Sequence, residues 1–212
     1  MERIIDVYVL NVEDLMEKAD QILPEIAPYY VQKYNKAKAE GVKRHELGAG
    51  ILLSRCLNVK EDSQLSFGEH GKPILNIENN DNTKEFNLSH SGKYVVLAVS
   101  DDAVGADIEQ IKRLKLPVLK RVLPPCFYEQ IEADYEKENA KSESDGKLIL
   151  GKSWTILEAV LKASGTGFIT EEYNQEDFFD GWHTRSTELD GEYVISCASR
   201  TPFSMNLIPM TV

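Results

Sequence analysis

Two polar motifs on either side of an apolar segment decide the expected fold: Asn87-Leu88-Ser89-His90-Ser91 and Val104-Gly105-Ala106-Asp107-Ile108-Glu109. The apolar segment, residues 94–99, is rich in β-forming residues and ends in Ser100-Asp101-Asp102. It is therefore predicted to be a buried strand that a turn closes, and a second strand is expected to start near Ala103.

The second motif places two carboxylates on one face of its strand. Because side chains alternate faces, Asp107 and Glu109 are expected on the same side, about 7 Å apart along the chain, with Ile108 in the core. Such a pair can form half of an oxygen-ligand site for a hard divalent cation. The alternative is an edge strand with a solvated acidic face. The hexapeptide alone favours this alternative over a metal site.

A third pattern lies in residues 153–165, which are predicted to be a helix that Gly165 ends. Helical spacing separates a polar face from an apolar face: Thr155, Glu158 and Lys162 on one, and Trp154, Leu157 and Leu161 on the other. Taken alone, Glu158 and Lys162 are best interpreted as an ordinary ion pair on the helix surface, which stabilises a helix by a few tenths of a kcal/mol.

Composition excludes several classes of protein. The 212 residues suffice for one compact unit or two small halves, and the hydrophobic and charged fractions, 42% and 28%, are those of a globular protein. A net charge of -11 argues against a nucleic-acid partner, which requires a broad basic face. The three cysteines show no Cys-x-x-Cys spacing and predict neither a disulfide framework nor a zinc site. Without a signal-like N-terminus or a membrane-spanning run, a soluble cytoplasmic protein is expected.

The first half contains three segments that suit an anion. Basic residues lead into residues 47–57, a predicted buried helix: Lys33, Lys36, Lys38, Lys43 and Arg44. Such a cluster is usually a solvated face, although phosphate oxygens can accept charge-assisted hydrogen bonds there. Gly71-Lys72-Pro73 predicts a tight turn. Ser89 and His90 supply donors at a strand end, although a lone histidine is more often structural.

Residues 92–100 are echoed by residues 191–199, a pattern consistent with an internal duplication even though short strands match easily by chance. We therefore place a boundary near Ala103, which gives subdomains over residues 1–103 and 104–212. The ligand pocket is expected in the cleft between them.

Three further elements are expected in the second half. Residues 128–141 form a charged helix, and residues 141–146 form a flexible loop. The closing segments, residues 193–198 and 203–207, are predicted to form a hairpin.

Together and in this order, the three motifs resemble those of the 4′-phosphopantetheinyl transferase superfamily, specifically its Sfp-like, double-length, monomeric group. That family carries a Ser-His pair after an Asn, a Gly-x-Asp-x-Glu strand and a later Trp-[Ser/Thr]-x-Lys-Glu helix that ends in Lys. The corresponding residues here are 87–91, 105–109 and 154–162. One position departs, because the family's Lys before the catalytic Glu is Leu157. Since Leu157 falls on the apolar face, we expect Leu157→Lys to alter turnover only modestly.

The resemblance implies an α+β fold of two similar α/β subdomains, related by a pseudo-twofold axis, with the active site between them. Residues 1–103 would form the coenzyme A-binding side, and residues 104–212 the metal and catalytic side. The implied reaction is Mg²⁺-dependent transfer of the 4′-phosphopantetheine arm of coenzyme A to a serine of an apo acyl or peptidyl carrier protein. It would release adenosine 3′,5′-bisphosphate. This transfer is holo-[acyl-carrier-protein] synthase activity.

The resemblance also assigns residues to roles. Asp107, Glu109 and Glu158 would bind Mg²⁺. The coenzyme A contacts would be Arg44, Lys72, Ser89, His90 and Asp107. Glu158, Lys162 and Asp107 would be catalytic, with Glu158 as the base for the incoming serine and Lys162 stabilising the leaving phosphate.

A basic run over residues 112–121, interleaved with apolar residues, is explained either as a solvated face or as a docking site for an acidic carrier protein. Two other functions stay open: a binding module for coenzyme A or a carrier protein that has lost catalysis, and a different Mg²⁺-dependent phosphotransferase. Carrier proteins of fatty-acid, polyketide and nonribosomal-peptide synthesis remain equally possible acceptors.

Overall fold

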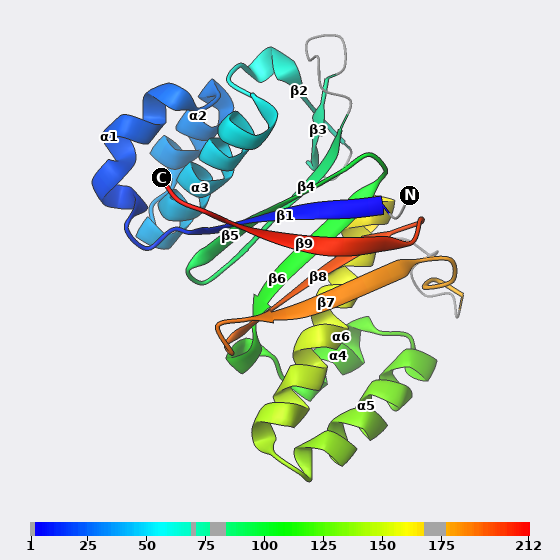
Figure 1. The fold of residues 1–212 in the computed structure, drawn as a ribbon. Coiled ribbons are helices and arrows are strands. Elements are labelled where there is room, and N and C mark those ends of the chain that lie inside the picture. The colour runs from blue at the N-terminus through cyan, green and yellow to red at the C-terminus, as the bar shows by residue number, and fades with distance from the viewer. Residues whose placement is uncertain (1–2, 69–70, 77–83, 168–176) are drawn as a thin grey trace.

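The strands of this chain form two main sheets on which helices pack (Figure 1). A computed structural model describes residues 3–68, 71–76, 84–167 and 177–212. The first sheet has the order β4-β5-β1-β9, with β1 at Arg3–Asn11, β4 at Glu85–Ser91, β5 at Tyr94–Ser100 and β9 at Phe203–Met210. The second has the order β6-β8-β7, with β6 at Val104–Gln110, β7 at His183–Leu189 and β8 at Tyr193–Ser199. A small hairpin joins β2, Leu65–Phe67, to β3, Pro73–Leu75.

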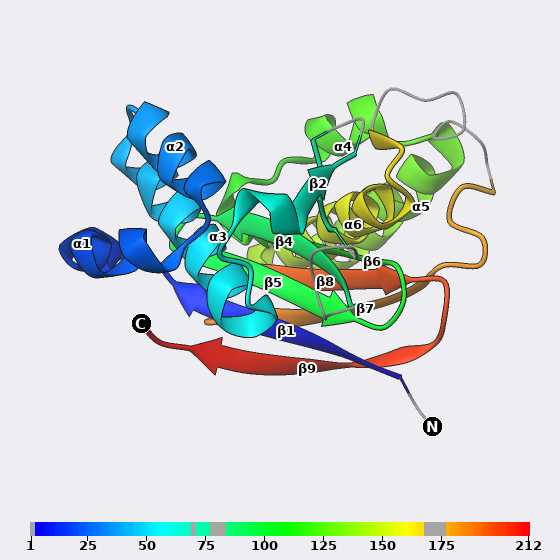
Figure 2. The same cartoon turned by 90° about the horizontal axis from the view of Figure 1, so that it is seen from above.

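Helices gather in two groups, one in each half of the chain. The first group contains α1 at Ala19–Ile22, α2 at Pro28–Lys36 and α3 at Glu40–Leu57. The second contains α4 at Leu116–Val122, α5 at Pro125–Asn139 and α6 at Glu143–Ser164. Figure 2 shows α2 and α3 at one end of the molecule and α4 to α6 at the other, with β4 and β6 between them. The expected α+β class is confirmed.

The predicted buried strand is β5, and the strand expected near Ala103 is β6. β5 pairs antiparallel with both β1 and β4. Its side chains reach two separate cores: Val95 and Leu97 pack in the cluster beneath α3, whereas Val96 and Ala98 pack in the cluster that joins the two sheets. Because both faces are covered, the strand is apolar throughout, as its sequence indicates.

Glycines bring the two long helices close to their sheets. A Cβ atom at Gly48 of α3 would lie 2.8 Å from Cγ1 of Val12 and 2.9 Å from Cγ2 of Val95. A Cβ atom at Gly105 of β6 would lie 1.9 Å from the carbonyl oxygen of Ala159 in α6. The backbones of β6 and α6 therefore touch at Gly105, where no side chain fits, and this contact sets how far the side chains of α6 stand from those of β6.

Two predictions about the second half are wrong. Residues 193–198 and 203–207 do not form a hairpin, because β8 pairs with β6 and β7 whereas β9 runs parallel to β1. Residues 141–146 are not a flexible loop, because α6 already begins at Glu143. The hydroxyl of Ser142 accepts a hydrogen bond from the backbone N–H of Asp145, which caps the helix, and acidic residues in the first turn suit its positive end.

The boundary near Ala103 and the pseudo-twofold axis stay predictions. β9 follows the boundary in sequence but completes the first sheet, so the two halves of the chain share that sheet. Within the part of the chain that the structure describes, no helix is long and apolar enough to cross a membrane.

Candidate functional site

Side chains of β4 hydrogen-bond to the backbone of β6 where the two sheets meet. Alternate residues of β4 accept from alternate N–H groups of β6: Asn87 Oδ1 from Ala106 at 2.9 Å, Ser89 Oγ from Ile108 at 3.4 Å and Ser91 Oγ from Gln110 at 3.3 Å. Because both strands alternate with a period of two, one face of β4 forms a regular ladder along β6. The Asn-x-Ser-x-Ser pattern thus joins the two sheets.

The same serines hold the two carboxylates of β6. Ser89 Oγ donates to Oδ1 of Asp107 at 2.7 Å, and Ser91 Oγ donates to Oε1 of Glu109 at 2.5 Å. Both carboxylates face β4, as the alternation predicts, and Ile108 is buried on the other side. No role in holding Glu109 was assigned to Ser91 from the sequence. The signal for it is the spacing, because Ser91 lies two residues after Ser89 and therefore on the same face of the strand.

Lys162 of α6 joins this network from above β6. Its Nζ lies 2.6 Å from Oδ1 of Asp107 and 3.0 Å from Oγ of Ser89. Asp107 is only 6% exposed. Burial raises the pKa of Asp107, and the Lys162 ammonium and the Ser89 hydroxyl counteract part of that shift. Lys162 is thus the charge partner of a buried carboxylate.

Glu158 lies one turn before Lys162 on α6 and is half-buried. Burial raises the pKa of Glu158, Lys162 opposes the shift, and the like charges of Asp107 and Glu109 add to it. A carboxylate whose pKa is raised is a stronger proton acceptor than one with an ordinary pKa. The environment of Glu158 therefore suits a general base.

One cavity of about 350 Å³ collects most of the expected site residues. Six of its lining residues carry polar side chains that the sequence singled out: Ser89, His90, Asp107, Glu109, Glu158 and Lys162. They come from β4, β6 and α6, so the cavity is built from both halves of the chain. This agrees with the expectation of a pocket between the halves.

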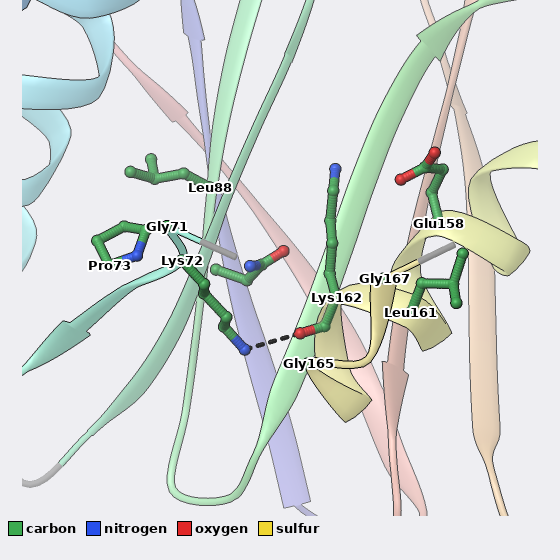
Figure 3. Close-up of a pocket in the computed structure, with 10 residues that line it drawn as sticks. Gly71, Lys72, Pro73, Leu88, Glu158, Leu161, Lys162, Gly165 and Gly167 are labelled. Carbon is green, nitrogen blue, oxygen red and sulfur yellow. Dashed lines mark hydrogen bonds between the residues drawn. The ribbon is translucent and has the colours of Figure 1, made fainter. Parts of the chain in front are cut away.

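A second cavity of about 260 Å³ shares Leu88, Glu158 and Lys162 with the first (Figure 3). Lys72 lines it from the turn before β3, and its Nζ donates to the backbone carbonyl oxygen of Lys162 at 2.8 Å. Burial lowers the pKa of Lys72. In Figure 3 the Glu158 and Lys162 side chains extend in the same direction from α6, away from this bond. Lys72 therefore links the turn before β3 to the end of α6.

Two of the expected coenzyme A contacts differ in their surroundings. His90 lines the first cavity and is exposed, yet partial desolvation and the nearby charges of His45, Lys162 and Lys33 lower its pKa to about 4. Arg44 is not among the described residues that line either cavity. It pairs with Glu40, and its Nε is buried without a hydrogen-bond partner among the described residues. An unsatisfied buried donor of this kind suits an anionic ligand.

The three carboxylates expected to bind Mg²⁺ fit that ion by their chemistry. Within the described ranges, no three His, Cys, Asp or Glu side chains stand close enough to form a metal cluster. Asp107, Glu109 and Glu158 nevertheless line one cavity, and they supply the oxygen donors that Mg²⁺ prefers. Their mutual repulsion contributes to the raised pKa of Glu158, and a divalent cation would relieve it. The Lys162 ammonium provides the positive charge beside Asp107.

The helix position that departs from the family pattern faces the core. Leu157 is 0% exposed and packs with Leu119 and Leu161, and Trp154 lies against the same cluster. The prediction that Leu157 faces packing rather than the carboxylates is confirmed.

The basic run of residues 112–121 is mostly exposed, but some of its apolar residues are buried and others are exposed. Leu114 and Leu119 are buried in the cluster with α6, whereas Val118 is 39% exposed. The two buried leucines hold this segment on the protein and are not available to a partner. The exposed cations remain the feature that an acidic partner would contact.

Comparison with known proteins identifies the family of this chain. The family model of the 4′-phosphopantetheinyl transferase superfamily matches residues 103–201. The chain is 41% identical to 4′-phosphopantetheinyl transferase AcpT of Salmonella typhi over 175 residues, which cover 82% of this chain and 84% of that protein. It is 27% identical to 4′-phosphopantetheinyl transferase Sfp of Bacillus subtilis (strain 168) over 156 residues, 71% of this chain and 65% of that protein.

A further relative, a 4′-phosphopantetheinyl transferase of Bacillus subtilis, is 31% identical over 129 residues, 58% of this chain. The match spans about half of that relative, 53% of its length. The match to AcpT nevertheless extends over most of both proteins. By this match, the chain belongs to the 4′-phosphopantetheinyl transferase superfamily.

Proposed function

We propose that this protein transfers the 4′-phosphopantetheine arm of coenzyme A to a serine of an apo acyl or peptidyl carrier protein. The observation that supports this most is the shared cavity, where a candidate base, a lysine and two further carboxylates meet donors from the other half of the chain. Such a pocket brings together what transfer from a diphosphate requires: a base, positive charge and anion donors.

The reaction forms a bond between the serine oxygen and the phosphorus that carries the pantetheine arm. The bond from that phosphorus to adenosine 3′,5′-bisphosphate breaks, and the bisphosphate leaves. Glu158 takes the serine proton, for which its raised pKa suits it. Lys162 stands one turn away, where its ammonium can stabilise charge on the leaving phosphate.

Asp107, Glu109 and Glu158 would hold Mg²⁺, which when bound draws negative charge from the diphosphate and orients it. Ser89 and Ser91 keep two of these carboxylates in place through the bonds described above. Arg44, Lys72 and His90 would hold the nucleotide end. Lys72 has three N–H donors, of which one is used by the Lys162 carbonyl, so another can bond a phosphate oxygen.

The carrier protein would approach the exposed cations of residues 112–121. Carrier proteins are expected to be acidic, and opposite charges accelerate encounter even though this chain is acidic overall. The release of adenosine 3′,5′-bisphosphate, a monomeric state and a cytoplasmic location belong to the same proposal.

The test is to incubate the full chain with coenzyme A, Mg²⁺ and an apo carrier protein and to weigh the carrier by intact-mass spectrometry. We expect the mass of one phosphopantetheine arm to be added, and a carrier whose acceptor serine is alanine should gain nothing. Binding of coenzyme A in calorimetry without transfer would indicate the binding module. Neither binding nor transfer would favour a different phosphotransferase and overturn the proposal.

Two controls assign the chemistry within that assay. Chelation of divalent cations should abolish transfer, and added Mg²⁺ should restore it. Glu158→Gln keeps the size of the side chain but not its basicity, so the turnover number should fall by about 10²-fold or more. Transfer at the full rate by this variant would refute the role of Glu158.

A further inference from the structure

His90 is backed by a second histidine that no sequence motif indicated. His45 of α3 stacks on His90 of β4, with ring centroids 4.2 Å apart and ring planes 20° from parallel. His90 lines the first cavity, whereas His45 is not among the described residues that line it. His45 therefore lies behind the residue that faces the ligand.

A hydrogen bond fixes the orientation of the His45 ring. Its Nε2 lies 2.9 Å from the backbone carbonyl oxygen of Gly92. A carbonyl oxygen only accepts, so Nε2 carries the hydrogen and donates it. Gly92 lies in the turn between β4 and β5, with φ at 54°. The His45 ring is thus anchored to the turn that directly follows His90.

The surroundings of His90 favour a neutral ring. Desolvation contributes most to its lowered pKa, and the charges of His45, Lys162 and Lys33 add to it. Lys33 is itself held by Glu46 at 2.9 Å. With its pKa near 4, His90 is neutral at physiological pH and presents one ring N–H group as a donor. Such a donor is directional. Its bond to a phosphate oxygen depends on the plane in which the ring is held.

We propose that His45 is a positioning residue, which fixes the plane of the His90 ring so that it can donate to a phosphate oxygen of coenzyme A. Stacking limits rotation of the His90 ring, and the bond to Gly92 keeps the stacking surface in place. This proposal rests on the proposed function and names a residue outside its three motifs.

Three variants separate the two contacts of His45. His45→Phe keeps the ring but loses the donor, His45→Gln keeps a donor but loses the ring, and His45→Ala loses both. We expect the KM for coenzyme A to rise about fivefold in the alanine variant with kcat nearly unchanged, since a ring pair contributes about 1 kcal/mol and 1.4 kcal/mol is tenfold. Phe and Gln should show smaller increases. His183→Ala, at an exposed position on β7, is the control and should leave KM unchanged.

The double variant shows whether His45 acts through His90. In the His90→Ala background, His45→Ala should have no further effect on KM. An equal increase in both backgrounds, an unchanged KM or a loss of kcat alone would each overturn the proposal. Thermal denaturation of every variant identifies any that fail to fold. If His45→Ala does not fold, His45→Phe, which conserves the packed ring, still tests the proposal.

Imidazole NMR spectra provide a readout that does not depend on coenzyme A. His45→Phe and His45→Ala should shift the His90 ring resonances in the free protein, and Ala should also broaden them as the ring becomes mobile. Unchanged His90 resonances would overturn the positioning role. If the variants shift the His90 resonances as expected but the wild-type chain neither binds nor uses coenzyme A, the proposed function is overturned instead.

Discussion

The ammonium of Lys162 lies 2.6 Å from the carboxylate of Asp107, so a cation from α6 already neutralises one of the three carboxylates expected to bind metal. It also contacts Ser89 on β4. One side chain thus joins the helix to both sheets. We therefore expect stability and the proposed catalysis to depend on the same ion pair.

Lys162→Met should lower the free energy of unfolding by about 2 kcal/mol, because it leaves a buried carboxylate without its charged donor. Mg²⁺ should restore part of this stability, since the metal can supply the missing charge. Urea denaturation with and without Mg²⁺ measures both effects. Lys147→Met is the control, because it removes an exposed ion pair on the same helix and should cost less than about 1 kcal/mol with no response to Mg²⁺. A larger Mg²⁺ response in the wild type would contradict this prediction.

Ser91→Ala should weaken Mg²⁺ activation of transfer, because Glu109 loses the hydroxyl that holds its Oε1. The loss of one hydrogen bond should also cost about 1 kcal/mol of stability. Titrating Mg²⁺ in the transfer assay gives the activation constant. Ser54→Ala is matched in burial and removes a single bond to the carbonyl of Glu25, far from the cavity. If both variants shift the Mg²⁺ dependence equally, Ser91 has no specific role.

His90 should make the folded protein less stable in acid. Its pKa falls from 6.5 to about 4 on folding, so between these values the unfolded chain holds a proton that the folded chain lacks. The free energy of unfolding therefore falls as the pH falls from 6.5 toward 4. His90→Gln removes this contribution, so the wild type should lose more stability than the variant across that window. Melting temperatures that decline in parallel would show that His90 does not titrate in this way.

Leu157→Lys tests whether the departure from the family pattern matters. Because Leu157 is fully buried, an uncompensated charge there should cost about 3 kcal/mol or more. Leu157→Met conserves volume and should cost less than about 1.5 kcal/mol. We expect the folded fraction of the lysine variant to turn over within a few-fold of the wild type, as measured by transfer at a temperature where both are folded. A gain of several orders of magnitude would mean that the natural residue impairs catalysis.

The sequence predicted the features of the site that depend on local periodicity. Asp107 and Glu109 face the same strand because side chains alternate, and the end of α6 at Gly165 follows from its left-handed backbone. The family resemblance then selected Glu158 and Lys162 from a helix whose pattern was otherwise ordinary. Their catalytic and metal-binding roles stay predictions.

Features that depend on contacts between distant segments could not be read in this way. The approach of Gly105 to Ala159 and the stacking of His45 on His90 each join elements that local patterns treat independently. The hairpin prediction failed for the same reason: β8 and β9 are adjacent in sequence, yet each finds a better partner elsewhere. Propensity indicates that a strand forms but not which strand it pairs with.

The parallel pairing of β1 with β9 has a consequence for synthesis on the ribosome. Arg3 faces Phe203, so β1 is translated well before the strand that pairs with it in parallel. Until β9 emerges, the outer edge of β1 exposes unpaired backbone groups, which is the kind of edge that captures strands from other chains. We therefore expect nascent chains to be prone to aggregation until β9 is made, and we expect a chaperone that shields β1 to raise the yield of folded protein.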